Sequence, residues 1–129
     1  MAMDVNSYFD YGTADHAADN SLSEAYQRFV VLQANGQFAV ADTAADSNVF
    51  GVLRDNVFQG ESPAVRTGSI TYVFAGGEVS VGDYVTNDAE GRAVVATTGQ
   101  VVLGQCIDFG GTTDSEIKIK MFLDRATVA

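Results

Sequence analysis

The second half of this sequence repeats the pattern of the first half. Apolar runs and turn residues recur in the same order at an offset of 55 residues, and after a two-residue deletion at an offset of 53. Agreement of several runs and their turns in order is far less probable by chance than agreement of one turn, and it predicts two similar supersecondary units. The matched pairs are Phe29-Val30 with Tyr84-Val85, Ala34-Asn35-Gly36 with Ala89-Glu90-Gly91, Phe38 to Ala41 with Ala93 to Ala96, and Val49 to Val52 with Val102 to Gln105.

Short apolar runs separated by turn residues predict β-strands throughout both units. Asn35-Gly36 and Gly76-Gly77 are strong hairpin signals because these residues tolerate positive φ. Gly51 and Gly104 fall inside predicted strands, where glycine usually permits a bulge or a close backbone approach. The sequence predicts an all-β fold, a small barrel or sandwich of short antiparallel strands. The runs are Phe29 to Leu32, Phe38 to Ala41, Val49 to Leu53, Ala64 to Arg66, Ile70 to Phe74, Asp83 to Thr86, Ala93 to Ala96, Val101 to Ile107, and Ile117 to Leu123.

The N-terminal segment differs in composition from the rest of the chain. Residues 1–23 are rich in Asp, Ala, Asn and Ser and lack the apolar periodicity of a core element. We therefore expect an extended arm over residues 1–23 and one β-domain over residues 24–129. An arm that orders on a partner and a frayed terminus are both open at this point.

The charge of the chain limits its partners. With 17 acidic and 7 basic residues, the net charge is -10. Such a field repels phosphate backbones and anionic lipid, so we expect neither nucleic acid nor membrane as a partner. Lys118 and Lys120 alternate with apolar residues in the last run, which predicts a half-buried strand whose lysines protect an exposed sheet edge.

The residues that carry chemistry are few. His16, the single histidine, lies in the polar arm, and Cys106, the single cysteine, lies in an apolar run that predicts a buried thiol. The acidic residues fall mostly at turns, and the segment 83–91 does not match the spacing of a calcium loop. We expect no catalytic residues, no metal and no cofactor.

The repeated motifs resemble the small capsid decoration, or head cement, proteins of tailed bacteriophages. The similar segments span about residues 25–124 and include the Val-Phe-Gly-Val-Leu strand at Val49 to Leu53, the segment Gly77 to Thr86, and Leu103-Gly104-Gln105-Cys106. The resemblance implies a non-enzymatic β-module, commonly a homotrimer, made in the host cytoplasm. It implies a place on the outside of the expanded head, where the module bridges and stabilises neighbouring subunits of the major capsid protein.

Members of that family often reach the shell with an N-terminal arm. Tyr8, Phe9 and Tyr11 are the aromatic residues of residues 1–23, and each aromatic ring buries a large area when it docks. These three residues are therefore the predicted capsid contacts.

Other classes of function are also compatible with the sequence. A virion-associated carbohydrate-binding module would use exposed aromatic residues, and Tyr72, Phe74 and Tyr84 are the candidates for such a platform. If these rings point into the core, no platform exists. A tail or baseplate domain and a small hydrolase are further alternatives.

Overall fold

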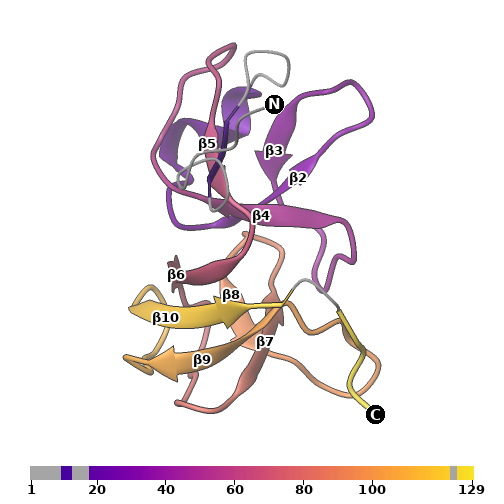
Figure 1. Cartoon of the computed structure of the whole chain (residues 1–129), viewed down its shortest axis with the longest axis vertical. Coiled ribbons are helices and arrows are strands. Elements are labelled where there is room, and N and C mark those ends of the chain that lie inside the picture. Colours follow the sequence, from indigo (N-terminus) through magenta and orange to yellow (C-terminus); the bar gives the residue numbers. More distant parts are fainter. Residues whose placement is uncertain (1–9, 13–17, 123–124) are drawn as a thin grey trace.

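The chain folds into two antiparallel β-sheets stacked along its long axis (Figure 1). The computed structural model describes residues 10–12, 18–122 and 125–129, and within these ranges every helix or strand is a β-strand except one short 3₁₀-helix. The all-β prediction is confirmed. The elements are β1 (Asp10–Gly12), η1 (Asn20–Glu24), β2 (Phe29–Leu32), β3 (Phe38–Val40), β4 (Val49–Leu53), β5 (Ala64–Arg66), β6 (Ser69–Phe74), β7 (Tyr84–Asn87), β8 (Ala93–Val95), β9 (Gly104–Asp108) and β10 (Glu116–Met121).

The two sheets have the same topology, as the repeat predicts. The first sheet has the strand order β1-β5-β4-β2-β3, and the second has the order β6-β10-β9-β7-β8. Each strand of the first sheet thus has a counterpart five strands later in the chain. Because the pairing as well as the sequence repeats, the two halves are two copies of one structural unit.

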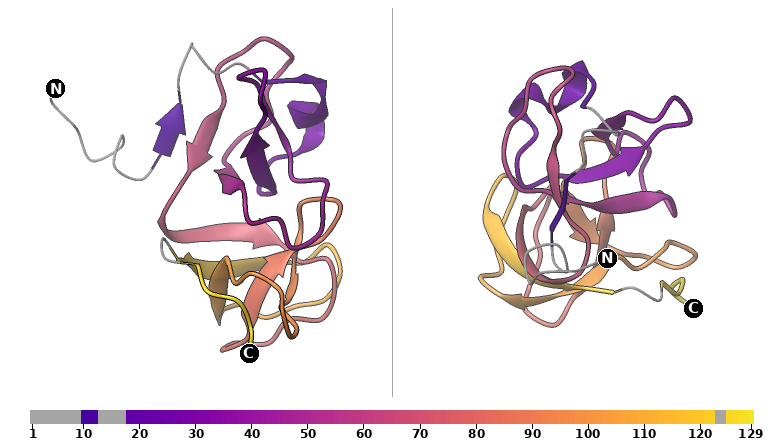
Figure 2. Two further views of the ribbon diagram at one scale, coloured as in Figure 1. Left: turned by 90° about the vertical axis from the view of Figure 1, so that its right-hand side faces the viewer. Right: turned by 45° about the horizontal axis from the view of Figure 1, so that its top comes forward.

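Each sheet curls, and its two ends approach each other without joining fully. A single parallel bridge links Ala18 to Phe38 on β3, and the corresponding bridge links Ala75 to Ala93 on β8. One bridge is not a continuous ladder, so neither sheet is a closed barrel. Of the two predicted architectures, the sandwich is the closer description (Figure 2).

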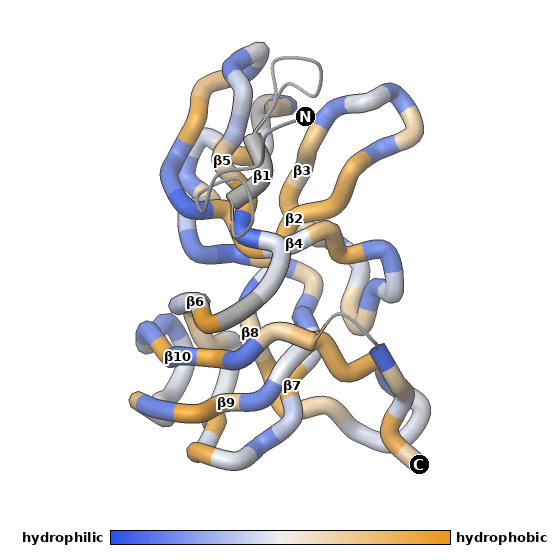
Figure 3. The backbone as a smooth tube through the Cα atoms, in the orientation of Figure 1, coloured by the Kyte–Doolittle hydropathy of each residue, from blue (hydrophilic) through white to orange (hydrophobic). Residues whose placement is uncertain are grey.

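The apolar side chains form two clusters. One cluster lies within the first unit and contains Leu22, Val30, Phe38, Leu53 and Val65. The larger cluster joins the units, because first-unit residues pack among second-unit residues; its members include Phe29, Val49, Val52, Val73, Val85, Leu103, Cys106, Ile117 and Ile119. Hydrophobic residues form continuous stretches in β2 and β3, whereas hydrophilic and hydrophobic residues alternate along β10 (Figure 3).

Gly51 and Gly104 occupy equivalent positions where the backbone of a neighbouring strand passes very close. A Cβ atom at Gly104 would lie 2.5 Å from the carbonyl oxygen of Lys120, and one at Gly51 would overlap the carbonyl oxygen of Arg66. The prediction of close backbone approach is confirmed at both sites.

Part of the N-terminal segment packs onto the first sheet. β1 pairs with β5, so that Tyr11 lies opposite Val65. Ala18 and Leu22 are fully buried, and Asp19 caps η1 by accepting a hydrogen bond from the amide of Ser21 at 2.8 Å. Some of the described residues before Ser23 therefore pack onto the first sheet. The boundary between arm and domain stays a prediction.

The side chain of Asn87 ties the two units together. It is fully buried at the end of β7, where its amide nitrogen donates to the carbonyl oxygen of Thr43 at 2.7 Å. Its amide oxygen accepts from the backbone of Asp46 at 2.9 Å. The backbone carbonyl of Asn87 accepts from Ala45 at 2.9 Å. One residue of the second unit therefore fixes the 43–46 loop of the first.

Replacing Asn87 by alanine should lower the free energy of unfolding by about 1–2 kcal/mol. The substitution leaves the amide of Asp46 and the carbonyl of Thr43 without their side-chain partner in a partly buried site. Urea denaturation of the two proteins measures the difference. Asn48→Ala in the same region is the control, because Asn48 is exposed and only its backbone amide makes a described bond, to Asp46; an equal effect of both substitutions would contradict the role of Asn87.

Candidate interaction surface

The outer face of the second sheet is the most distinctive surface of the described part of the molecule. Residues directly opposite each other on antiparallel strands point to the same side. The register places Ile70, Lys120, Gln105 and Tyr84 in one row across β6, β10, β9 and β7. Because the alternate residues of β10 are buried, this row faces away from the core.

A second row lies beside the first. It runs from Tyr72 through Lys118 to Asp108. The ring of Phe109 stacks on that of Tyr72, with 6.3 Å between centroids and 17° between planes. The Lys118 Nζ atom lies 5.9 Å from the centroid of the Tyr72 ring, a cation–π distance. The outer face thus combines lysine and aromatic side chains.

Lys118 and Lys120 do not protect a sheet edge, contrary to the prediction. β10 lies between β6 and β9 and is hydrogen-bonded on both sides. The alternation of lysine and apolar residues correctly predicted a half-buried strand. The same alternation occurs in an edge strand and in an interior strand with one solvent-facing side, so it does not tell the two apart. Neither lysine forms an ion pair with any residue that the structure describes.

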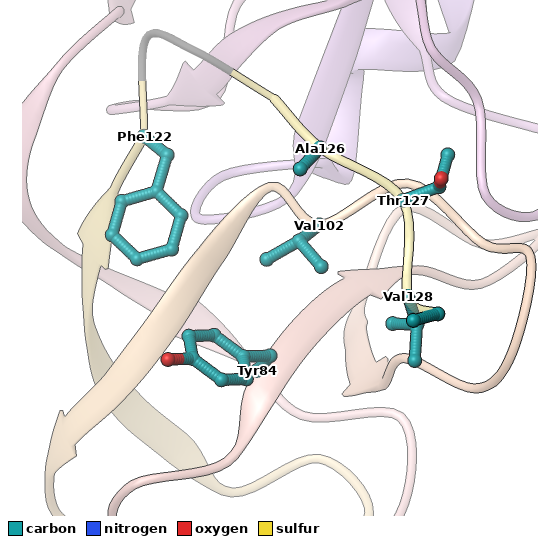
Figure 4. A pocket seen from close by; sticks show the side chains of 7 residues that line it. Tyr84, Val102, Phe122, Ala126, Thr127 and Val128 are labelled. Atoms are coloured by element: carbon teal, nitrogen blue, oxygen red, sulfur yellow. The ribbon is translucent and has the colours of Figure 1, made fainter.

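An apolar cavity adjoins this face next to Tyr84 (Figure 4). Its volume is about 440 Å³, and it lies between the sheet and the C-terminal residues. The rings of Tyr84 and Phe122, 6.2 Å apart and tilted by 51°, form one wall. The backbone of Val102 donates to the carbonyl of Ala126 at 2.8 Å and holds the C-terminal segment in place. The lining residues are Tyr84, Val102, Phe122, Ala126, Thr127, Val128 and Ala129.

The predicted capsid-contact residues fall mostly outside the described structure. Tyr8 and Phe9 lie outside the described residues, as does His16. The backbone of Tyr11 belongs to β1 and pairs with β5 at the side of the first sheet. The assignment of these aromatic residues to capsid binding therefore stays a prediction.

The three candidates for a sugar platform lie on one face but do not form one open surface. Tyr72 and Tyr84 are 36% and 51% exposed, so they do not point into the core. Two interior strands separate them, and each ring already contacts another aromatic ring. Phe74 packs edge-on against Tyr26, with 5.2 Å between centroids.

Cys106 is fully buried in the shared core, as its apolar surroundings predict. Burial raises the pKa of the thiol. Its Sγ atom donates to the carbonyl oxygen of Asp108 at 3.6 Å. A buried, protonated thiol acts as a small apolar side chain.

The described residues contain neither a cluster of metal-binding side chains nor a membrane-spanning helix. Within residues 10–12, 18–122 and 125–129, no group of three or more His, Cys, Asp or Glu residues is placed to hold a metal ion. The described part of the chain also contains no helix with the length and apolar character needed to cross a membrane.

Comparison with known proteins identifies a shared architecture. No family model and no curated protein matches the sequence. Among solved structures, the N base of the head fiber protein gp8.5 from bacteriophage phi29 matches with a TM-score of 0.63 and 16% sequence identity. The match covers 88% of this chain and 94% of the fiber base. The two proteins share a fold. The structural neighbour is a phage head protein, although it is a head fiber rather than a decoration protein.

The sequence did not predict the outer face of the second sheet as an interaction surface. Its residues come from four strands, and only the register brings Ile70, Gln105 and Tyr84 into one row with Lys120. One signal was available, because both lysines of the chain lie two residues apart in one alternating run.

Proposed function

We propose that this protein is a structural component of a tailed-bacteriophage virion that binds the outside of the expanded head. The observation that carries the proposal is the fold shared with a head fiber base over nearly the whole of both chains. The order of sequence motifs, which resembles that of capsid decoration proteins, supports the same role. The protein acts by binding rather than by catalysis.

At the head, the protein bridges neighbouring subunits of the major capsid protein and stabilises the shell. A homotrimer engages several subunits at once, so that modest contacts add up to high avidity. A protein that binds only the assembled, expanded shell stabilises that state by mass action. The protein is made in the host cytoplasm and joins the capsid exterior after expansion.

Co-sedimentation with heads tests the proposed function. The heads are assembled from the major capsid protein encoded by the same genome, in both the procapsid and the expanded form. We expect the protein to pellet with expanded heads and to stay in the supernatant with procapsids. Failure to pellet with either form would contradict head binding, and light scattering that gave the mass of one 13.6 kDa chain would contradict the trimer.

To test whether the arm contributes to head binding, the deletion must be shorter than the predicted arm of residues 1–23. Removing residues 1–23 would also remove the buried Ala18 and Leu22, so a loss of binding would not separate arm contact from misfolding. Deleting residues 1–9 leaves these side chains and β1 in place. We expect weaker pelleting of this variant with expanded heads, and unchanged pelleting would contradict a role for Tyr8 and Phe9.

A carbohydrate-binding function is the second candidate, favoured by the exposure of Tyr72 and Tyr84. A sugar platform needs open ring faces, whereas both rings pack against neighbouring aromatic rings. Binding to purified host polysaccharide, with no binding to heads, would favour this function over the proposed one.

A further inference from the structure

We propose that the outer face of the second sheet docks on the head, and that it recognises an acidic patch of the shell surface that also exposes apolar side chains. This inference rests on the proposed function, and it adds which surface is used and what chemistry the shell presents. The docking face is defined here by Ile70, Tyr72, Tyr84, Phe109, Lys118 and Lys120.

Exposed apolar side chains are distributed unevenly between the two units. Among the described residues, the large exposed hydrophobic side chains of the first unit are Tyr26 and Phe58. The second unit has six, and four of them lie on the docking face, where Ile70 is 44% and Phe109 is 55% exposed; the other two are Val81 and Val95. Exposed apolar side chains rimmed by polar and charged residues are typical of protein interaction sites.

The internal repeat gives an independent reason to regard this face as a packing surface. The row Lys120–Gln105–Tyr84 of the second sheet corresponds to the row Arg66–Val52–Phe29 of the first. In the first sheet, Val52 and Phe29 of that row are buried in the core shared with the second unit. The same face of the unit is therefore covered in the first copy and uncovered in the second.

Charge determines the partner that fits this face. Lys118 and Lys120 are the only lysines of a chain whose net charge is -10. The described arginines are occupied: Arg92 pairs with Asp88, Glu90 and Asp114, Arg54 lies 3.5 Å from Asp55, Arg28 donates to the carbonyl of Glu90, and Arg125 donates to the carbonyl of Val49. Arg66 has a partner as well.

The two lysines thus form a cationic stripe that makes no ion pair with the described residues. Asp108 lies opposite Lys118, and Glu116 comes two residues before it. An acidic protein surface would be repelled by most of this molecule and attracted to the stripe, which orients the encounter. The apolar cavity beside Tyr84 lies next to the stripe and offers a place for an apolar side chain of the shell.

A charge-matched pair of variants tests the docking face. Lys118→Gln with Lys120→Gln and the single change Arg54→Glu each make the net charge more negative by two units. Arg54 belongs to the first unit and its side chain is 49% exposed. We expect the double variant to bind expanded heads about tenfold or more weakly, and R54E to bind like the wild type. Thermal unfolding verifies that both variants are folded.

A lysine footprint of the unaltered protein provides a second readout. Lys118 and Lys120 are the only lysine side chains, so after acetylation by an amine-specific reagent, mass spectrometry of the peptide that contains them reports on this face, separately from the N-terminal amino group. We expect both lysines to be protected in the head-bound protein and modified in the free protein. This experiment stays informative if the double variant does not fold.

The outcomes separate this inference from the proposed function. If the wild type does not bind heads, the proposed function fails and the docking face with it. If the wild type binds while the double variant binds equally well and both lysines stay reactive, the docking face is wrong and head binding stands. A lysine variant with an altered oligomeric state would assign the face to contacts between copies and would overturn the inference.

Discussion

Replacing Phe29 by alanine should lower the free energy of unfolding by about 3–5 kcal/mol. The side chain is fully buried and belongs to the cluster that joins both units. Its amide also donates to the carbonyl of Gly91 at 2.7 Å, so β2 is fixed to the β7–β8 turn. A cavity at this position removes apolar contacts from both units at once. Denaturation by urea, followed by fluorescence and circular dichroism, measures the loss.

Phe58→Ala is the matched control for this substitution. The same side chain is removed, but Phe58 is 75% exposed, so we expect a change within about 0.5 kcal/mol. Because the core is shared, F29A should retain one cooperative transition by both probes. Two separate transitions in the wild type, with only one shifted by F29A, would contradict a common core.

Gly104→Ala should destabilise the protein by about 1–3 kcal/mol, toward the upper end of that range. The added methyl group would lie 2.5 Å from the carbonyl oxygen of Lys120. That oxygen belongs to the backbone of β10, which is paired on both sides and cannot move without disturbing its ladders. Thermal and chemical denaturation measure the effect.

Gly77→Ala provides the control, because nothing lies within 4 Å of a Cβ atom there and its φ angle is not positive. We expect this variant to have nearly the stability of the wild type. Gly51→Ala, at the equivalent position of the first unit, should behave like G104A. A stable G104A protein would mean that β9 and β10 are less closely paired than described.

Most of the fold was predictable from the sequence because the local signals and the repeat agree. All nine predicted apolar runs correspond to strands, β2–β10, with bounds that agree or differ by a few residues. The largest shift concerns the run from Val101, since β9 begins only at Gly104. Val101 instead forms an isolated bridge with Thr127, a long-range contact that apolar character alone does not reveal.

The elements that the sequence did not predict depend on tertiary contacts. β1 is only three residues long and polar, and its pairing with β5 rather than its own composition makes it a strand. Ala18 and Leu22 were assigned to a polar arm, yet both are buried because η1 packs beside β3. Isolated apolar residues in a polar segment carry no periodic signal.

The docking face was not predictable for a related reason. A strand that alternates lysine with isoleucine is the same sequence at an edge and in the interior of a sheet. Only the strand order shows that β10 is central and that Tyr72 and Tyr84 lie on the same side as the lysines. The repeat then explains why that side resembles a packing surface.

Cryo-electron microscopy of expanded heads incubated with the purified protein tests the central claim most directly. We expect added density on the outside of the shell, into which the two stacked sheets fit with β10 and the docking face toward the major capsid protein. Heads incubated without the protein are the control. A map without added density would contradict head binding, and density with the first sheet toward the shell and Lys118 and Lys120 facing solvent would contradict the proposed docking face.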